Sequence, residues 1–262
     1  MSDGPVYETL NVEREQGVAV VTINRPERRN AIDLTVQTEL GAVLDSIASD
    51  ESAQALIVTG GGEKAFAAGA DIRRSRDYDR RTALRSAMQR LFDQLEALTI
   101  PTFAAINGYA LGGGCELAMA CDVRIAAESA CLGLPETGLG ILPGAGGTQR
   151  LSRLVGIGHA LDMVLTGRVV SAPEALAMGL VSRVVPDADL NITTRQLAGS
   201  VIARGPQATR LAKLVVRTGA DTDQRSGLVV ERLAQALLYD TDDKREGVDA
   251  FLAKRPPEFS GR

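Results

Sequence analysis

The sequence predicts an α/β fold in which the strands of a parallel sheet alternate with helices. Short apolar segments at residues 55–59, 102–106 and 123–126 have the length and composition of buried strands. The segments between them, such as residues 33–47 and 80–98, carry apolar residues at helical spacing. Strands that alternate with helices in this order are typical of a parallel sheet covered by helices.

The first predicted element is a β-hairpin. Residues 6–13 and 17–23 alternate in polarity and are rich in β-branched residues, and residues 15–17 provide the turn. After a polar loop, Asp33 has the position and the residue type of a helix N-cap. The apolar residues of the helix that follows are Val36, Leu40, Leu44 and Ile47.

Residues 80–98 are predicted to form one continuous helix between the next two strands. Its apolar face consists of Leu84, Met88, Leu91 and Leu95. A glycine-rich turn at residues 107–114 then joins the strand at 102–106 to a short helix at 115–121. Beyond Pro143 the chain is predicted to be largely helical, with one further strand at residues 181–185.

We expect a division near residue 200. Residues 1–200 would form a core that holds the active site, and residues 201–262 would form a helical region, punctuated by Pro206 and Gly219. The helices of this second region are expected to pack on a neighbouring subunit or on the core.

Composition narrows the function classes. The net charge of −4 provides no global positive field for nucleic acid or for an anionic membrane. No stretch reaches the roughly 20 apolar residues that span a bilayer. Residues 1–8 are polar and acidic, unlike a signal or transit peptide, so we expect a cytoplasmic protein.

The cysteine and histidine contents limit the chemistry. Cys115, Cys121 and Cys131 are odd in number and lack framework spacing, so we expect neither disulfides nor a metal site. His159 is the single histidine, is expected on a helix, and has no Gly-x-Ser-x-Gly elbow beside it. Acid–base chemistry would therefore depend mainly on carboxylates.

Three segments carry the residues that chemistry requires: residues 66–72, residues 107–117, and residues 134–136 with 140–147. In the second segment, the glycines at 112–114 allow a ligand to approach the backbone closely. They also leave the first amides of a helix without partners, at the positive end of its dipole. Glu116 in the first helical turn would lie beside this site for negative charge.

The first and third segments complete the predicted site. Small residues around Gly69 expose backbone donors, and two such turns facing each other would form an oxyanion hole. Glu136, which follows Pro135, supplies a second carboxylate 20 residues after Glu116. A phosphate-binding loop is an alternative for the glycines, but they match neither the phosphate-binding nor the dinucleotide-binding pattern, which disfavours it. Either glutamate, taken alone, could also be a solvated surface residue.

Taken together and in order, the three segments resemble the signature of enoyl-CoA hydratases in the crotonase (enoyl-CoA hydratase/isomerase) superfamily. The resemblance covers most of the chain and includes residues 165–167, 175–182 and 240–254. It implies a crotonase (ClpP-like) spiral of ββα units with a C-terminal helical trimerisation region. The expected assembly is a homo-trimer or a homo-hexamer.

The resemblance also implies roles for single residues. The peptide N–H groups of Ala70 and Gly113 would form the oxyanion hole for a thioester carbonyl. Glu116 and Glu136 match both positions at which hydratases carry glutamate. Our working assignment has Glu116 take a proton from water and Glu136 supply one to the α-carbon, although the sequence alone allows the reverse.

A larger set of residues is expected along the bound coenzyme A. Arginine suits phosphate because its guanidinium binds in a bidentate manner, although each arginine could equally be a solvated surface residue. The expected residues are Arg25, Arg28, Ala68, Ala70, Asp71, Ile72, Arg73, Gly113, Phe251 and Lys254. Phe251 and Lys254 share a helix face and would reach the site of a neighbouring subunit; otherwise they belong to a plain terminal helix.

The expected reaction is the addition of water to a trans-2-enoyl-CoA to give a 3-hydroxyacyl-CoA, in fatty-acid or related acyl-CoA degradation. No permanently bound cofactor is expected, since coenzyme A is part of the substrate. The alternatives are a Δ3,Δ2-enoyl-CoA isomerase or another acyl-CoA lyase of this superfamily, and a silent assembly subunit. The paired glutamates disfavour the isomerase and the silent subunit.

An RNA-binding relative is a remote alternative, because residues 73–90 contain seven arginines. The acidic net charge and the lack of stacking aromatics other than Tyr78 disfavour it. Two departures from the resemblance, Leu134 and residues 77–85, lie on the acyl-chain side of such sites. They leave the preferred chain length open.

Overall fold

A computed structural model describes residues 6–70, 76 and 79–262 of the protein. Its larger sheet has six strands in the order β1-β2-β3-β5-β7-β10. These strands are β1 (Leu10–Glu15), β2 (Val18–Ile23), β3 (Ala55–Gly60), β5 (Thr102–Ile106), β7 (Val123–Ala127) and β10 (Arg183–Val185). All neighbours except β1 and β2 are parallel, which confirms the predicted α/β class.

The predicted hairpin is confirmed. β1 and β2 pair antiparallel from Leu10 opposite Ile23 to Glu15 opposite Val18. Gln16 and Gly17 between them have φ values of 49° and 81°. Two successive positive φ values match the right-handed twist of a two-residue hairpin loop, and glycine adopts this conformation without strain.

A second sheet lies beside the first and was not predicted. It has the order β4-β6-β8-β9, formed by β4 (Ala65–Ala67), β6 (Tyr109–Leu111), β8 (Cys131–Gly133) and β9 (Val169–Ser171). The chain passes from β3 to β4, from β5 to β6 and from β7 to β8, so it alternates between the sheets and builds the expected ββα units. β4 and β6 are parallel neighbours, so the turns that follow them leave the sheet side by side.

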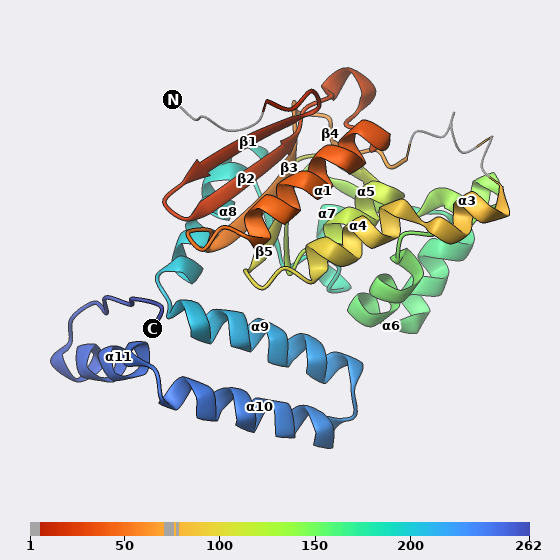
Figure 1. The fold of residues 1–262 in the computed structure, drawn as a ribbon. Coiled ribbons are helices and arrows are strands. Elements are labelled where there is room, and N and C mark those ends of the chain that lie inside the picture. Colours follow the sequence, from red (N-terminus) through yellow and green to blue (C-terminus); the bar gives the residue numbers. More distant parts are fainter. Residues whose placement is uncertain (1–5, 71–75, 77–78) are drawn as a thin grey trace.

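Helices cover the sheets (Figure 1). α1 (Leu34–Ala48) begins where predicted, since the Asp33 carboxylate accepts a hydrogen bond from the Val36 N–H at 3.1 Å. Its buried residues are Val36, Leu40, Val43, Leu44 and Ile47. The other helices around the core are α5 (Gly113–Ala120), α6 (Gly147–Thr166), α7 (Ala172–Ala177) and α8 (Leu190–Ile202).

The prediction of one helix over residues 80–98 is wrong. The chain forms α3 (Arg80–Arg85) and α4 (Ala87–Glu96), which are separated by Ser86 in a left-handed conformation with φ 30° and ψ 63°. The Ser86 hydroxyl donates to the Gly144 carbonyl at 3.3 Å. The break separates the predicted apolar face, because Leu84 is 80% exposed whereas Leu95 is buried.

Three helices follow residue 205: α9 (Pro206–Asp221), α10 (Gln224–Tyr239) and α11 (Asp242–Ala253). α9 runs below the core, α10 returns antiparallel beneath it, and α11 lies near the C-terminus (Figure 1). α9 also contacts the core, since Lys213 donates to the Ile100 carbonyl at 2.9 Å. α8 packs on β3, β5 and β7 and crosses residue 200, and the division of the chain at that position stays a prediction. No helix in the described ranges is long and apolar enough to cross a membrane.

Candidate active site

The turns after β4 and β6 face each other closely. The Ala70 nitrogen lies 3.5 Å from the point where a Cβ on Gly113 would sit. Reciprocally, the Gly113 nitrogen lies 3.1 Å from the point where a Cβ on Gly69 would sit. Gly69 and Gly112 have φ values of 88° and 53°, which other residues adopt only with strain. Glycine is therefore required for this close approach of two backbone segments.

The two facing amides are available to a ligand. Gly113 is the first residue of α5, so its N–H has no intrahelical acceptor. Among the hydrogen bonds of the described residues, neither Ala70 nor Gly113 donates its N–H to a protein acceptor. The α5 dipole adds positive potential at the same place. The pair has the arrangement expected of an oxyanion hole, whose role stays a prediction.

Glu116 occupies the first turn of α5 and is 2% exposed. Its Oε1 accepts hydrogen bonds from the N–H groups of Ala145 at 2.7 Å and Gly147 at 2.8 Å. Burial raises the pKa of this carboxyl above its usual range, while the Gly147 and Ala145 amides and the charge of Arg150 act in the opposite direction. The amides favour the ionised carboxylate, as a general base requires.

Glu136 lies in a short 3-10 helix, η2 (Pro135–Leu139), and is half-buried. Its Oε1 lies 3.1 Å from the point where a Cβ on Gly112 would sit. Burial, followed by the nearby charge of Glu116, raises the pKa of Glu136 to about 7. Its Oε2 is buried and has no hydrogen-bond partner among the residues that the structure describes. A proton on Glu136 is thus accessible near neutral pH.

The different surroundings of Glu116 and Glu136 give the two carboxyls different acid–base properties. Glu116 is held by two backbone donors, whereas Glu136 has a free oxygen and a pKa near neutrality. A pair of this kind can take a proton at one group and supply one at the other. Gly112 and Gly113 precede Glu116 in the chain, and the Cβ point of Gly112 lies 3.1 Å from Glu136 Oε1, so both carboxyls adjoin the turn that carries one of the facing amides.

Ala68 and Arg25, two further predicted site residues, form hydrogen bonds with other parts of the protein. The Ala68 N–H donates to the Arg29 carbonyl at 3.0 Å, which ties the first turn to the loop after β2. The Arg25 guanidinium is buried and donates to Asp33 at 2.7 Å and to the Ala31 carbonyl at 2.9 Å. Its local role is therefore structural, and a contact with phosphate stays a prediction.

Arg28 is exposed at the end of a 3-10 helix, η1 (Pro26–Arg28). Phe251 is 81% exposed on α11, and Lys254 ends that helix in a left-handed conformation. α11 lies far from α5 within one chain (Figure 1), so neither residue covers the site of its own chain. Asp71, Ile72 and Arg73 lie outside the described residues.

Two features of the site, the amides that hold Glu116 and a side chain that lines the hole, were not assigned from the sequence. Ala145 and Gly147 hold Glu116, although the glycine-rich run at 144–147 was noted only as part of a motif. Met88 places its Sδ 2.9 Å from the Cβ point of Gly113 and so lines the hole. Leu134, suspected of affecting the acyl chain, is fully buried in the core.

Other chemistry near the site is limited. Cys115 directly precedes Glu116, is fully buried, and has its pKa raised to about 12 by burial and then by the charges of Glu116 and Glu136. His159 is exposed on α6. Within residues 6–70, 76 and 79–262, no group of three or more His, Cys, Asp or Glu side chains could hold a metal ion.

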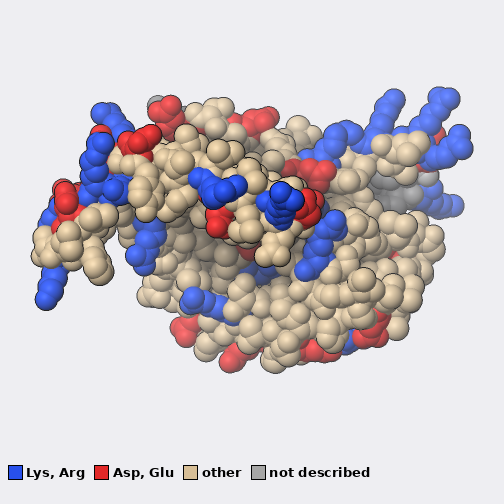
Figure 2. Space-filling view, turned by 90° about the horizontal axis from the view of Figure 1, so that it is seen from below, with Lys and Arg blue, Asp and Glu red and all other residues tan. Residues whose placement is uncertain are grey.

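Basic side chains gather at one end of the molecule. Figure 2 shows them at its right edge, the end that α3 occupies in Figure 1. α3 contributes the exposed residues Arg80, Arg81 and Arg85. A local positive field can therefore exist on a chain whose net charge is −4.

The chain belongs to the enoyl-CoA hydratase/isomerase family, whose sequence model matches residues 13–262. It is 42% identical to the crotonyl-CoA hydratase of Syntrophomonas wolfei over 97% of this chain and 98% of that protein. It is also 42% identical to the short-chain-enoyl-CoA hydratase of Clostridium acetobutylicum, over 94% and 95% of the two chains. The crystal structure of an enoyl-CoA hydratase from Bacillus anthracis superposes with a TM-score of 0.94 at 41% identity, covering 97% of this chain and 100% of that one. The predicted crotonase fold is thereby confirmed.

Proposed function

We propose that the protein is an enoyl-CoA hydratase that adds water to a trans-2-enoyl-CoA and gives a 3-hydroxyacyl-CoA. The observation that carries this proposal is the pair of unlike carboxyls, Glu116 and Glu136, beside two facing backbone amides. The relatives named crotonyl-CoA hydratase and short-chain-enoyl-CoA hydratase support it. The expected pathway is fatty-acid or related acyl-CoA degradation in the cytoplasm.

In the proposed reaction, the N–H groups of Ala70 and Gly113 bind the thioester carbonyl oxygen. This polarises the conjugated double bond and makes the β-carbon electrophilic. Water attacks that carbon and loses its proton to Glu116, while the proton of Glu136 moves to the α-carbon. The new C–O and C–H bonds replace the C=C π bond, and proton exchange restores both carboxyls.

Coenzyme A would lie along the turn that contains Ala68 and Ala70. Arg28 and the basic end formed by Arg80, Arg81 and Arg85 offer charge for its phosphates. No permanently bound cofactor is required, because the thioester brings coenzyme A with it.

An assembly of three or six copies completes the proposal. α10 exposes Leu228, Leu233 and Leu237 at 50%, 63% and 65%. An apolar helix face of this size would be left in water in a monomer, and a neighbouring copy would cover it. Phe251 and Lys254 would then lie over the site of that neighbour.

The test is an assay with crotonyl-CoA, in which hydration removes the absorbance of the conjugated thioester. We expect turnover with the purified protein and almost none with a Glu116→Gln/Glu136→Gln double variant. The competing isomerase would instead leave crotonyl-CoA unchanged and create that absorbance from a 3-enoyl-CoA. The second carboxyl disfavours isomerisation, since a single general base is sufficient for it.

A further inference from the structure

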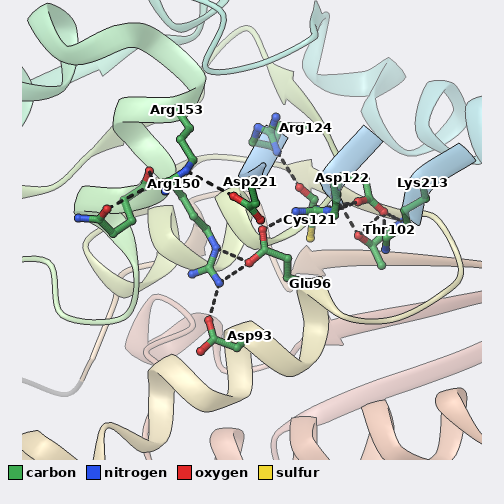
Figure 3. Close-up of polar contacts among 12 residues, drawn as sticks. Asp93, Glu96, Thr102, Cys121, Asp122, Arg124, Arg150, Arg153, Lys213 and Asp221 are labelled. Atoms are coloured by element: carbon green, nitrogen blue, oxygen red, sulfur yellow. Dashed lines mark hydrogen bonds and ion pairs between the residues drawn. The ribbon is translucent and has the colours of Figure 1, made fainter. Parts of the chain in front are cut away.

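Arg150 is a buried arginine in the first turn of α6, outside the predicted site residues. Figure 3 shows its side chain reaching towards α4. Its Nε and Nη2 donate to Glu96 Oε2 at 3.0 and 2.6 Å, and its Nη2 also donates to Asp93 at 2.7 Å. Two carboxylates thus fix the guanidinium in one orientation.

The remaining donor of this guanidinium is directed at the active-site loop. Arg150 Nη1 donates to the Ala145 carbonyl at 3.0 Å. Gly146 has a φ of 96°, and a Cβ at this residue would overlap Nη1. The peptide between Ala145 and Gly146 therefore lies directly against the guanidinium, and glycine makes this approach possible.

The same short loop binds Glu116 with its amides. Ala145 accepts from Arg150 through its carbonyl and donates to Glu116 Oε1 through its N–H. The Gly147 N–H donates to the same oxygen. Arg150 and Glu116 are thus joined through a single residue. The Arg150 charge is also among the influences that lower the pKa of Glu116.

A series of ion pairs links Glu96, which binds Arg150, to the C-terminal helix α9. Glu96 pairs with Arg217 on α9, and Arg217 pairs with Asp122 at 2.7 Å. Lys213 on α9 pairs with Asp122 at 2.8 Å (Figure 3). The Glu96 and Arg217 side chains are each 31% exposed, whereas Arg150 and Lys213 are 10% exposed. Glu96 accepts from both Arg150 and Arg217, so two guanidinium groups hold the carboxylate that orients Arg150.

We infer that Arg150 is a positioning residue for Glu116: it holds the Ala145–Gly147 loop so that both loop amides meet one carboxylate oxygen. Arg150 makes no proposed contact with the substrate and acts through Glu116. This inference rests on the proposed hydration, in which Glu116 must be ionised to accept a proton from water. Loss of the arginine removes the bond to Ala145 and a positive charge together.

The test compares Arg150→Met with Arg153→Met. Arg153 lies on the same helix, is more than half exposed, and pairs at 3.7 Å with the exposed Asp221, so its loss should not change turnover. Arg150→Met should lower kcat for crotonyl-CoA by on the order of 10²-fold with little change in KM. The acid limb of its pH profile should move to higher pH. Among the described residues, the charged or titratable groups that interact with Glu116 are Glu136, Cys115 and Arg150, and Arg150 alone changes in this variant.

A double-mutant cycle separates positioning from general destabilisation. In a Glu116→Gln background, adding Arg150→Met should change the residual rate by less than about 2-fold, because the residue it positions is already lost. Equal fold losses in both backgrounds, or an unshifted acid limb, would overturn the inference. Arg150→Lys, which keeps the buried charge, should have a kcat between those of Arg150→Met and wild type. If Arg150→Met does not fold, Arg150→Lys takes its place in the double-mutant cycle with Glu116→Gln. Wild-type protein that fails to hydrate crotonyl-CoA would instead contradict the proposed function.

Discussion

Gly147 and Glu116 are in direct contact: the Gly147 N–H lies 2.8 Å from Glu116 Oε1, and a Cβ on Gly147 would sit 2.8 Å from the same oxygen. Gly147→Ala should therefore push the carboxylate out of place and lower kcat by about 10²-fold. Gly158→Ala on the same helix is the control, since a Cβ there meets nothing within 4 Å. Unchanged turnover in Gly147→Ala would show that the position of Glu116 is not critical.

Glu116→Gln and Glu136→Gln should each reduce hydration by about 10²–10⁴-fold, which is the usual loss when one general acid–base group is removed. Glutamine keeps the size of the side chain, so the fold and the binding of coenzyme A should be retained. Steady-state kinetics with crotonyl-CoA and circular dichroism of each variant check this. A variant with near wild-type turnover would lose its assigned role.

The decline of turnover on the alkaline side of the pH profile should reflect the loss of the Glu136 proton. The pKa of this carboxyl is raised to about 7, and the proposed acid is active only while protonated, so turnover should fall as pH rises through about 7. Glu136→Gln, with its low residual rate, should lack this limb. A wild-type profile without any decline between neutral and mildly alkaline pH would argue against Glu136 as the acid.

The same shift predicts a pH dependence of stability. Because the folded pKa of about 7 exceeds the ordinary value of 4.5, the folded protein binds more protons than the unfolded chain between these values. The contribution of Glu136 to the free energy of unfolding should therefore be largest below about pH 4.5 and decline as pH rises to about 7. Urea unfolding of wild type and Glu136→Gln across this window measures the difference.

Assembly should be trimeric or hexameric. Sedimentation at micromolar concentration should show a species well above the 27.6 kDa chain. Leu233→Asp, at a position 63% exposed in one chain, should dissociate it because a buried interface does not accept an unpaired charge. A wild-type protein that sediments only as a monomer would contradict the proposal.

Phe251→Ala and Lys254→Ala should raise KM for enoyl-CoA without dissociating the assembly. Point variants are preferable to a truncation after Asp249, because the N–H groups of Ser260 and Gly261 donate to the Asp243 carboxylate and stabilise this end of the chain. Arg245→Ala, an exposed change on the same helix, is the control. An unchanged KM in both variants would make the segment purely structural.

The sequence predicted the larger sheet well because its inner strands are continuous apolar runs, such as residues 102–106, and its hairpin strands alternate in polarity over six residues each. It did not predict the smaller sheet, whose strands have three residues each, too few for a periodic pattern. The break at Ser86 was missed for a different reason. Leu84 continues the helical spacing of Leu91 and Leu95, and only the tertiary structure places it in solvent.

Within the site, the glycine turns and the two glutamates were identified because short sequence segments are enough to recognise them. Arg150 was not, since an arginine at a helix start has the pattern of a surface residue and its burial depends on Asp93 and Glu96 from a distant segment. The distinct settings of Glu116 and Glu136 likewise depend on long-range contacts. Local chemistry was therefore predictable, and the partners that tune it were not.

The burial of Cys115 has a consequence for handling the substrate. A 2-enoyl thioester is an electrophile, and a thiolate that reached its β-carbon would add to it and form a thioether. Cys115 adjoins the proposed base in the chain, yet its side chain is fully enclosed and its pKa of about 12 keeps the sulfur protonated at neutral pH. The fold thus protects the catalyst from its own reactant while leaving water as the nucleophile.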